Sequence, residues 1–265
     1  MRGAIRIGVG GWTFEPWRGV FYPKELKQKD ELAYASRRLT AIEINGTYYS
    51  TFKPDSWKKW RDETPDGFVF TVKGSRFTTN RRELAGAAES VERFCNQGLA
   101  ELGERLGPIF WQLPHTKKFD PDDLDAFFTL LPRSLGGRPL RHALEPRHDS
   151  FRTPEYPALL RKHGVANVYA RHGKYPEIAD VTADFVYARL QTGDDAVETA
   201  YPPAELDAWA THMKTWAAGG AAEGLPLVDP AGKPAPAARD VFAFIIHEGK
   251  VRAPAGAMAL IERVK

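Results

Sequence analysis

Charged and amide side chains stand at the ends of several apolar runs in this sequence of 265 residues. Glu43 and Asn45 end one run, Lys73 ends the next, and Gln112 and Glu145 lie at the ends of two later ones. If these runs are parallel strands, their carboxyl ends meet at one edge of the sheet. The pattern therefore predicts one polar site that is assembled from distant segments.

The two carboxylates of this set, Glu43 and Glu145, are the candidate catalytic residues. Two carboxylates in one site acquire different pKa values, so one can act as a general acid and the other as a general base. The alternative is structural, because a buried carboxylate needs a cationic partner. In that interpretation Glu43 pairs with Lys73, and Glu145 pairs with Arg189 or Lys73.

Cations outnumber carboxylates at the expected site, since Arg76, Arg147 and Arg189 add to Lys73. A guanidinium group suits phosphate and carboxylate recognition because its N–H donors form a planar fork. We therefore expect an anionic small-molecule ligand such as a phosphate ester, with a nucleic-acid end as a further possibility. The alternative is a lattice of internal salt bridges.

Aromatic residues and one histidine complete the candidate binding set. Trp12 and Tyr48 could stack a sugar or a base, or could close the top of the fold as apolar plugs. His148 could bind a ligand or could order its own loop. The candidate substrate-binding residues are Trp12, Asn45, Tyr48, Lys73, Arg76, Gln112, Arg147, His148 and Arg189.

A metal site is an alternative, because carboxylates and histidines at strand ends can hold metal ions. The residues available for it are Glu43, Glu145, His148, His172, His247 and Glu248. Their spacing contains no compact ligand motif, and the glycines at 8, 10 and 11 lack the third glycine of a dinucleotide fingerprint. We therefore expect no tightly held metal and no cofactor.

Runs of strand length and stretches of helical periodicity alternate along the chain. Eight strands are predicted, over residues 5–11, 41–45, 68–73, 108–113, 142–145, 165–170, 184–190 and 241–246. Helices are predicted over residues 27–39, 55–64, 81–106, 121–131, 153–163, 202–218 and 255–264. Residues 219–239 are rich in Gly, Ala and Pro without periodicity, which indicates a long loop.

This alternation predicts parallel βαβ units. Eight units in about 250 residues are typical of one closed barrel. We therefore expect an α/β fold, a single TIM-like (β/α)8 parallel barrel over residues 1–265, with an open doubly wound sheet as the alternative. Because side chains alternate along a strand, we expect these residues to point into the barrel mouth: Glu43, Asn45, Lys73, Gln112 and Glu145.

Five blocks resemble the signatures of the DUF72 family (YecE-like proteins). They are GGWTF at 10–14 with WRGVFYP at 17–23, EINGTYY at 43–49, FTVKGSRFT at 70–78, LGPIFWQLP at 106–114 and HALEPRHDSF at 142–151. The resemblance implies a TIM-like barrel but no particular reaction. The ends of the sixth, seventh and eighth strands depart from the family's usual pattern, so no activity is carried over from relatives.

Composition narrows the class of protein. Hydrophobic residues make up 43% of the chain and charged residues 27%, as in globular proteins. The net charge of +3 is too small to indicate strong nucleic-acid binding. No apolar run approaches the roughly 20 residues of a membrane span, so no membrane partner is expected. The single Cys95 excludes an intrachain disulfide, and we expect a cytoplasmic location.

Three functions follow from these observations. The leading hypothesis is a metal-independent enzyme that acts on a phosphorylated or other anionic small molecule. The second is a metal-dependent nuclease or sugar isomerase-like enzyme, by analogy of fold alone. The third is a non-catalytic binding protein for a nucleic-acid end or a protein partner.

Overall fold

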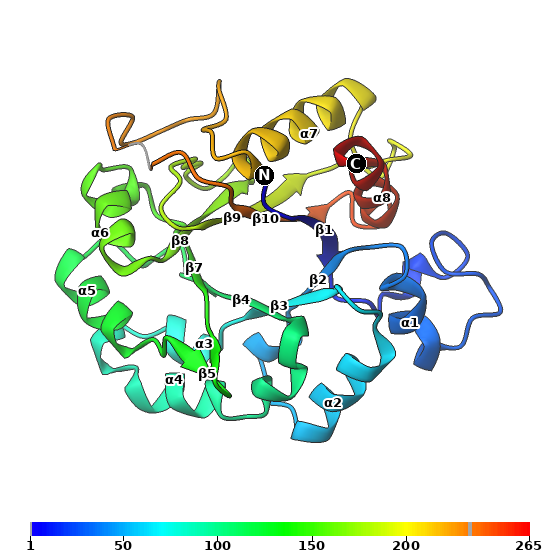
Figure 1. Ribbon diagram of the computed structural model, residues 1–265, viewed down its shortest axis with the longest axis horizontal. Helices are drawn as coiled ribbons and strands as arrows, with labels where there is room; N and C mark the ends of the chain where they lie inside the picture. The colour runs from blue at the N-terminus through cyan, green and yellow to red at the C-terminus, as the bar shows by residue number, and fades with distance from the viewer. Residues whose placement is uncertain (1, 233–234) are drawn as a thin grey trace.

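The computed structural model describes residues 2–232 and 235–265, and within them eight parallel strands close into a barrel (Figure 1). The strands are β1 (Ile5–Gly10), β2 (Ala41–Ile44), β3 (Val69–Lys73), β4 (Leu106–Gln112), β7 (His142–Glu145), β8 (Ala166–Arg171), β9 (Phe185–Thr192) and β10 (Asp240–Glu248). They follow the order of the chain, and β1 pairs with β10 to complete the ring. The predicted barrel is confirmed, and the open sheet is wrong.

The barrel interior is apolar at its centre and polar at the carboxyl ends of the strands. Ala41 and Phe110 belong to the apolar cluster inside the ring. Two residues further along the same strands, and therefore on the same face, stand Glu43 and Gln112. The period of two thus places the predicted polar residues in a layer above an apolar floor.

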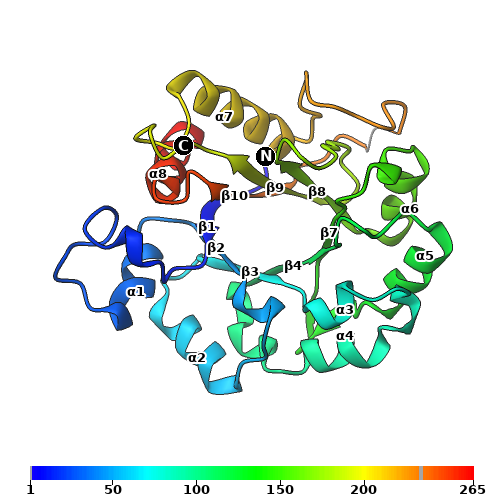
Figure 2. The same cartoon turned by 180° about the vertical axis from the view of Figure 1, so that it is seen from behind.

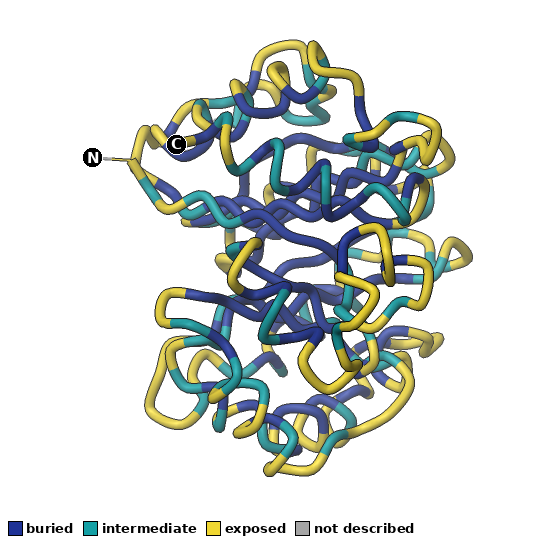
Figure 3. The backbone as a smooth tube through the Cα atoms, turned by 90° about the vertical axis from the view of Figure 1, so that its right-hand side faces the viewer, coloured by how far each residue is buried: buried dark blue, intermediate teal, exposed yellow. Residues whose placement is uncertain are grey.

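Helices cover the outside of the ring and bury its outward face (Figures 2 and 3). In the described residues the α-helices are α1 (Glu31–Ala35), α2 (Pro54–Glu63), α3 (Arg76–Thr79), α4 (Ala88–Cys95), α5 (Pro121–Leu130), α6 (Glu155–His163), α7 (Pro203–Ala217) and α8 (Ala253–Val264). Short 3-10 helices are η1 (Glu15–Trp17), η2 (Gln28–Asp30), η3 (Gly46–Tyr48), η4 (Leu84–Gly86), η5 (Leu99–Arg105) and η6 (Asp149–Phe151). No described helix has both the length and the apolar character needed to cross a membrane.

Capping residues set several helix ends where the sequence predicts them. The Asp120 carboxylate accepts a hydrogen bond from the amide of Asp123 and begins α5. Gly164 ends α6 in the left-handed conformation, with φ of 63°. The helix expected over 27–39 is shorter than predicted, because only η2 and α1 form within it.

The long helix expected over residues 81–106 is wrong, because the chain breaks there into η4, α4 and η5. Gly98 has φ of 121°, a conformation that few other residues adopt. A Cβ atom at Gly98 would lie 2.8 Å from Cδ1 of Trp57 on α2. The glycine therefore turns the chain and also lets η5 approach α2, which a continuous helix would prevent.

The alternation of strands and helices fails between β8 and β9, where residues 172–184 form no helix. The described part of the predicted loop 219–239 packs there instead. The Asp180 carboxylate accepts hydrogen bonds from the amides of Val228 and Asp229, at 2.8 and 3.0 Å. The amide of Ala179 donates to Pro226 O at 2.8 Å. One loop thus covers the barrel where the regular fold would place a helix.

A two-stranded hairpin precedes β7 and has no counterpart among the predicted elements. It pairs β5 (Ser134–Leu135) with β6 (Arg138–Pro139) in antiparallel register. Gly136 and Gly137 form its turn with φ of 58° and 76°. A Gly-Gly pair between short runs is a hairpin signal, so the sequence contained this information.

Candidate functional site

Arg189 joins the two candidate catalytic carboxylates at the carboxyl end of the barrel. Its guanidinium donates Nε to Glu43 Oε2 at 3.0 Å and Nη2 to Glu43 Oε1 at 3.1 Å. Its Nη1 donates to Glu145 Oε2. Both carboxylates have no exposed surface, and Arg189 is 5% exposed. A buried cation that pairs with two buried anions offsets their loss of hydration.

A second set of donors surrounds Glu145. Arg147 Nε and Gln112 Nε2 each donate to its Oε1 at 2.8 Å. The Gln112 amide oxygen then accepts a hydrogen bond from Lys73 Nζ, also at 2.8 Å. Because Gln112 Nε2 points at a carboxylate, its oxygen must point at Lys73.

Hydroxyl groups connect the network to the barrel interior. Tyr187 donates its hydroxyl to Glu43 Oε2 at 2.8 Å. Thr71 Oγ1 lies 2.8 Å from the same hydroxyl. Burial, together with the charge of Glu43, raises the pKa of Tyr187, so its hydroxyl keeps its proton. Glu43 therefore accepts from both Arg189 and Tyr187, and its position is fixed.

The charges of the network shift the pKa values of its members. Burial alone would raise the pKa of Glu145, but Arg189, Arg147 and Lys73 outweigh it and lower the pKa to about 2. Burial and the charge of Arg189 lower the pKa of Lys73 to about 8. The charges of Glu145 and Glu43 outweigh the burial of Arg189 and raise its pKa. Glu145 thus stays ionised at neutral pH, whereas Lys73 can gain or lose a proton.

A cavity of about 500 Å³ opens above this network. Its lining includes four cationic side chains, Lys73, Arg147, Arg189 and Lys250, and no carboxylate among the described lining residues. Gln191, on β9, also lines it and is 2% exposed. Gln191 Nε2 is a buried donor without a hydrogen-bond partner among the described residues. The cavity therefore offers positive charge and a free donor.

His247, near the end of β10, lines the cavity, and His172, directly after β8, lies beside it. The rings of His172 and His247 lie 5.0 Å apart, and the His172 ring lies 4.5 Å from that of Tyr175. Arg147 also faces Tyr175, with Cζ 4.6 Å from the ring centre. His247 has φ of 74° at the end of β10, an uncommon conformation for a residue other than glycine. In the sequence these histidines were candidates only as metal ligands. Their contact with each other could not be predicted, because they belong to the ends of two strands that are not neighbours in the barrel.

Most of the predicted site residues meet at the mouth. The cavity or the network beneath it contains Glu43, Asn45, Lys73, Gln112, Glu145, Arg147 and Arg189. Tyr48 borders it, because its ring lies 4.4 Å from Lys73 Nζ. Tyr49 and Trp17 also line the cavity, and Trp17 Nε1 donates to Lys250 O at 2.7 Å.

Three predicted binding residues are not in the mouth. Trp12 packs against Trp60 of α2, with ring centres 5.1 Å apart, in the outer layer. Arg76 is exposed on α3 outside the cavity lining. His148 begins η6, where its Nδ1 accepts from the amide of Ser150 at 3.1 Å, so it orders its own loop. For these residues the strand-end rule fails, because each lies in or after a loop that turns its side chain away.

The ion pairs differ in one respect from the structural alternative. Glu43 pairs with Arg189, and the expected pair with Lys73 is wrong. Lys73 instead donates to the neutral amide of Gln112. The expected pair between Glu145 and Arg189 is present.

Among the residues that the structure describes, no three His, Cys, Asp or Glu side chains come close enough to hold a metal ion. Glu43 and Glu145, the strongest candidate ligands, share the guanidinium of Arg189. The cation between the two carboxylates is thus supplied by the chain itself.

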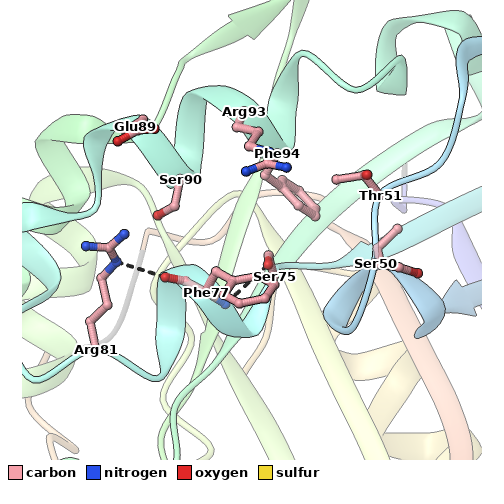
Figure 4. Close-up of a pocket in the computed structure, with 10 residues that line it drawn as sticks. Ser50, Thr51, Ser75, Phe77, Arg81, Glu89, Ser90, Arg93 and Phe94 are labelled. Atoms are coloured by element: carbon pink, nitrogen blue, oxygen red, sulfur yellow. Dashed lines mark hydrogen bonds between the residues drawn. The ribbon is translucent and has the colours of Figure 1, made fainter.

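A second cavity, of about 440 Å³, lies between η3, α3 and α4 (Figure 4). Its polar groups bond locally: Arg81 Nε donates to Phe77 O at 2.8 Å, and the amide of Phe77 donates to Ser75 Oγ at 3.2 Å. None of the network around Arg189 lines this cavity. We therefore place the candidate site in the barrel mouth.

The chain resembles known proteins over nearly its whole length. The model of the family described as "Protein of unknown function DUF72" matches residues 6–265. The UPF0759 protein YecE of Escherichia coli K12 is 29% identical over 147 residues, which are 56% of this chain and 50% of that protein. The alignment thus spans about half the length of this curated relative.

Solved structures share the fold. A DUF72 family protein from Thermotoga maritima is 23% identical, with a TM-score of 0.70 over 97% of both chains. Another from Enterococcus faecalis is 16% identical, with a TM-score of 0.70 over 98% of this chain and 95% of that one. Because the family model covers nearly every residue, the chain belongs to the DUF72 family of proteins of unknown function.

Proposed function

We propose that this chain is a metal-independent enzyme that acts on a small phosphorylated or otherwise anionic molecule bound in the barrel mouth. The observation that carries the proposal is the cavity lining, which has four cationic side chains and no carboxylate among its described residues. Its volume of about 500 Å³ suits a small molecule. An anion there would relieve repulsion that the two buried carboxylates do not fully offset.

Donors other than the cations support an oxygen-rich ligand. Gln191 Nε2 is buried at the cavity and unpaired among the described residues, and a buried unpaired donor costs about 1–3 kcal/mol. Asn45 also lines the cavity. A phosphate or carboxylate oxygen would satisfy these amides while the cations neutralise its charge.

The acid and base roles expected of Glu43 and Glu145 stay predictions. The contacts favour different roles for these residues, because Glu145, with a pKa of about 2, is a weak base. In our proposal the carboxylates hold Arg189 and Arg147 in place. Lys73, with a pKa of about 8, is then the group whose proton is exchanged near neutral pH.

The shared guanidinium of Arg189 favours this hypothesis over a metal-dependent enzyme, because it engages the two carboxylates that would otherwise be ligands. Elemental analysis of chain purified without chelators tests this point. Near-stoichiometric zinc, iron or manganese would favour the metal-dependent alternative. We also propose the cytoplasm as its location, in line with a buried free thiol at Cys95, and cell fractionation tests that.

Melting temperature against phosphate concentration, at constant ionic strength, tests the anion site. A ligand that binds the folded chain raises its stability by about 2.7 kcal/mol at one hundred times Kd. Lys250→Met and Arg147→Met remove cavity cations and should each weaken phosphate binding about tenfold, or about 1.4 kcal/mol. Lys58→Met, on the exposed face of α2, is the matched control and should bind as the parent does.

Two results would contradict the proposal. Phosphate and sulfate could stabilise the parent no more than chloride does, or the cavity variants could match Lys58→Met. A short oligonucleotide serves as a further arm. Strong, salt-dependent binding of that oligonucleotide with no response to phosphate would favour the non-catalytic hypothesis.

A further inference from the structure

Lys73 differs from the other cations of the mouth because its nitrogen can become a nucleophile. An arginine stays protonated at every relevant pH, whereas a lysine ammonium that loses its proton exposes a lone pair. Lys73 ends β3 and is partly buried, and its Nζ faces the same cavity as Arg147 and Arg189. A molecule bound in this cavity would therefore lie next to the Lys73 nitrogen.

The surroundings of Lys73 hold its side chain in a defined position. Nζ lies 4.4 Å from the ring centre of Tyr48 and 5.8 Å from that of Phe110. One N–H donates to Gln112 Oε1 at 2.8 Å. Two aromatic rings and one hydrogen bond thus orient the nitrogen.

The hydrogen-bond partner of Lys73 is a neutral amide, and this affects how readily the ammonium group loses its proton. A carboxylate in the place of the Gln112 amide would hold the ammonium in its charged form. Gln112 cannot turn its amide round without losing the bond from its Nε2 to Glu145. The ionised Glu145 therefore keeps a carbonyl oxygen in front of Lys73, while Arg189 and Arg147 repel an added proton.

We propose that Lys73 is a nucleophile that forms an imine with the carbonyl group of an anionic aldehyde or ketone held in the barrel mouth. This rests on the proposed function and names its substrate class: small molecules with both a carbonyl group and a phosphate or carboxylate. Arg147 and Lys250 line the same cavity as Lys73, so they can hold the anionic group while the carbonyl carbon faces Lys73 Nζ.

The step balances without any further reactant. The neutral Nζ donates its lone pair to the carbonyl carbon, and the π electrons of the C=O bond move to oxygen. A proton moves from nitrogen to that oxygen, and the carbinolamine forms. Solvent water protonates the hydroxyl, which leaves as water while the C=N bond forms, and the nitrogen returns its remaining proton to the solvent. Nothing is oxidised or reduced.

The ionisation of Lys73 supports this chemistry. With a pKa of about 8, roughly a tenth of the side chains are neutral at pH 7. For an ordinary lysine with a pKa of about 10.4, fewer than about one in a thousand are neutral at the same pH. At pH 7 the neutral fraction of Lys73 is therefore more than about a hundred times that of an ordinary lysine, so Lys73 should be the more reactive amine.

Reductive trapping tests the inference on the full chain. Pyridoxal 5′-phosphate and pyruvate, a phosphorylated aldehyde and a carboxylate ketone, are added at pH 7 with cyanoborohydride, which reduces an imine to a stable secondary amine. Peptide mapping should locate one adduct, on Lys73. Its rate should rise between pH 7 and pH 9 with a midpoint near 8, and inorganic phosphate should compete with the probe.

Two variants separate this inference from the proposed function. Lys73→Arg keeps the positive charge but has no nucleophile, so it should lose trapping at least tenfold and still be stabilised by phosphate. Lys58→Met should trap as the parent does. Competition by phosphate in the parent gives a readout that needs no variant to fold.

The inference is overturned if the adducts in the parent are spread over exposed lysines, or if Lys73→Arg traps as much as the parent. If phosphate stabilises the parent but Lys73 gives no adduct, the imine is wrong and the anion site stands. If phosphate fails to stabilise the parent, the proposed function itself is wrong, and so is the substrate class named here.

Discussion

Replacing Arg189 by methionine tests whether the buried network stabilises the barrel as its contacts indicate. The substitution keeps much of the side-chain volume but removes the cation that pairs with Glu43 and Glu145. Both carboxylates are fully buried, so they cannot regain water without opening the structure. Removing one partner of a buried ion pair typically costs about 3–5 kcal/mol.

The magnitude can be checked against the pKa of Glu145. Its shift from an ordinary value of 4.5 to about 2 corresponds to about 3 kcal/mol of folding stability at neutral pH. Because the folded-state pKa is lowered, this contribution is present above pH 4.5 and is lost as the pH falls toward 2. The destabilisation caused by Arg189→Met should therefore be greatest at neutral pH and shrink in acid.

Urea denaturation of parent and variant at several pH values measures this difference. At pH 7 we expect a loss of about 3–5 kcal/mol, or roughly 6–20 °C in Tm. Below pH 4.5 the difference between parent and variant should narrow, because the parent then loses the contribution of ionised Glu145.

Arg141→Met is the matched control, since Arg141 forms a partly exposed ion pair with Asp240 at 2.9 Å. An exposed pair contributes about 0–1 kcal/mol. The reasoning is refuted if Arg189→Met costs no more than Arg141→Met, or if its cost does not change with pH.

Three further outcomes are expected. Gly98→Ala should cost about 1–3 kcal/mol in urea denaturation, because of its positive φ and the tight space beside it, whereas Gly86→Ala, with open space around it, should be nearly neutral. Asp180→Ala should speed hydrogen exchange of the amides of Val228 and Asp229 about tenfold or more, because hydrogen bonds to charged groups contribute about 1.5–3 kcal/mol. Unchanged exchange would contradict the docking of that loop. His142 has a pKa lowered to about 4 by burial, so the parent should lose about 3 kcal/mol as the pH falls from 6.5 to 4, and His142→Phe, though less stable, should lack this loss. An equal pH dependence in parent and variant would show that another group titrates there.

Local sequence patterns were enough to predict the barrel and the inward face of its strands. Both depend on local patterns, because a period of two decides which side chains share a face of a strand. Glu43, Gln112 and Glu145 could therefore be assigned to the mouth without knowing their neighbours. The start of α5 and the end of α6 were also predictable, since a helix cap involves residues only a few positions apart.

Which of these groups bond to each other depends on contacts between distant parts of the chain. Glu43 and Arg189 are 146 positions apart, and whether they meet depends on how deep each side chain sits in the ring. Lys73 lies one layer further out and meets Gln112 instead. The sequence shows that carboxylates and cations converge, but distances of a few ångströms select the pairs, and these distances depend on the closure of the whole barrel.

The positions of side chains in loops could not be predicted from the sequence either. Their residues have no period that fixes a direction, so Trp12 and His148 could not be placed from neighbouring strand positions. The meeting of His172 with His247 and the docking of the 219–239 loop on Asp180 likewise join segments whose contacts form only when the barrel closes. Local patterns determine the elements of this protein, whereas contacts between distant segments determine its chemistry.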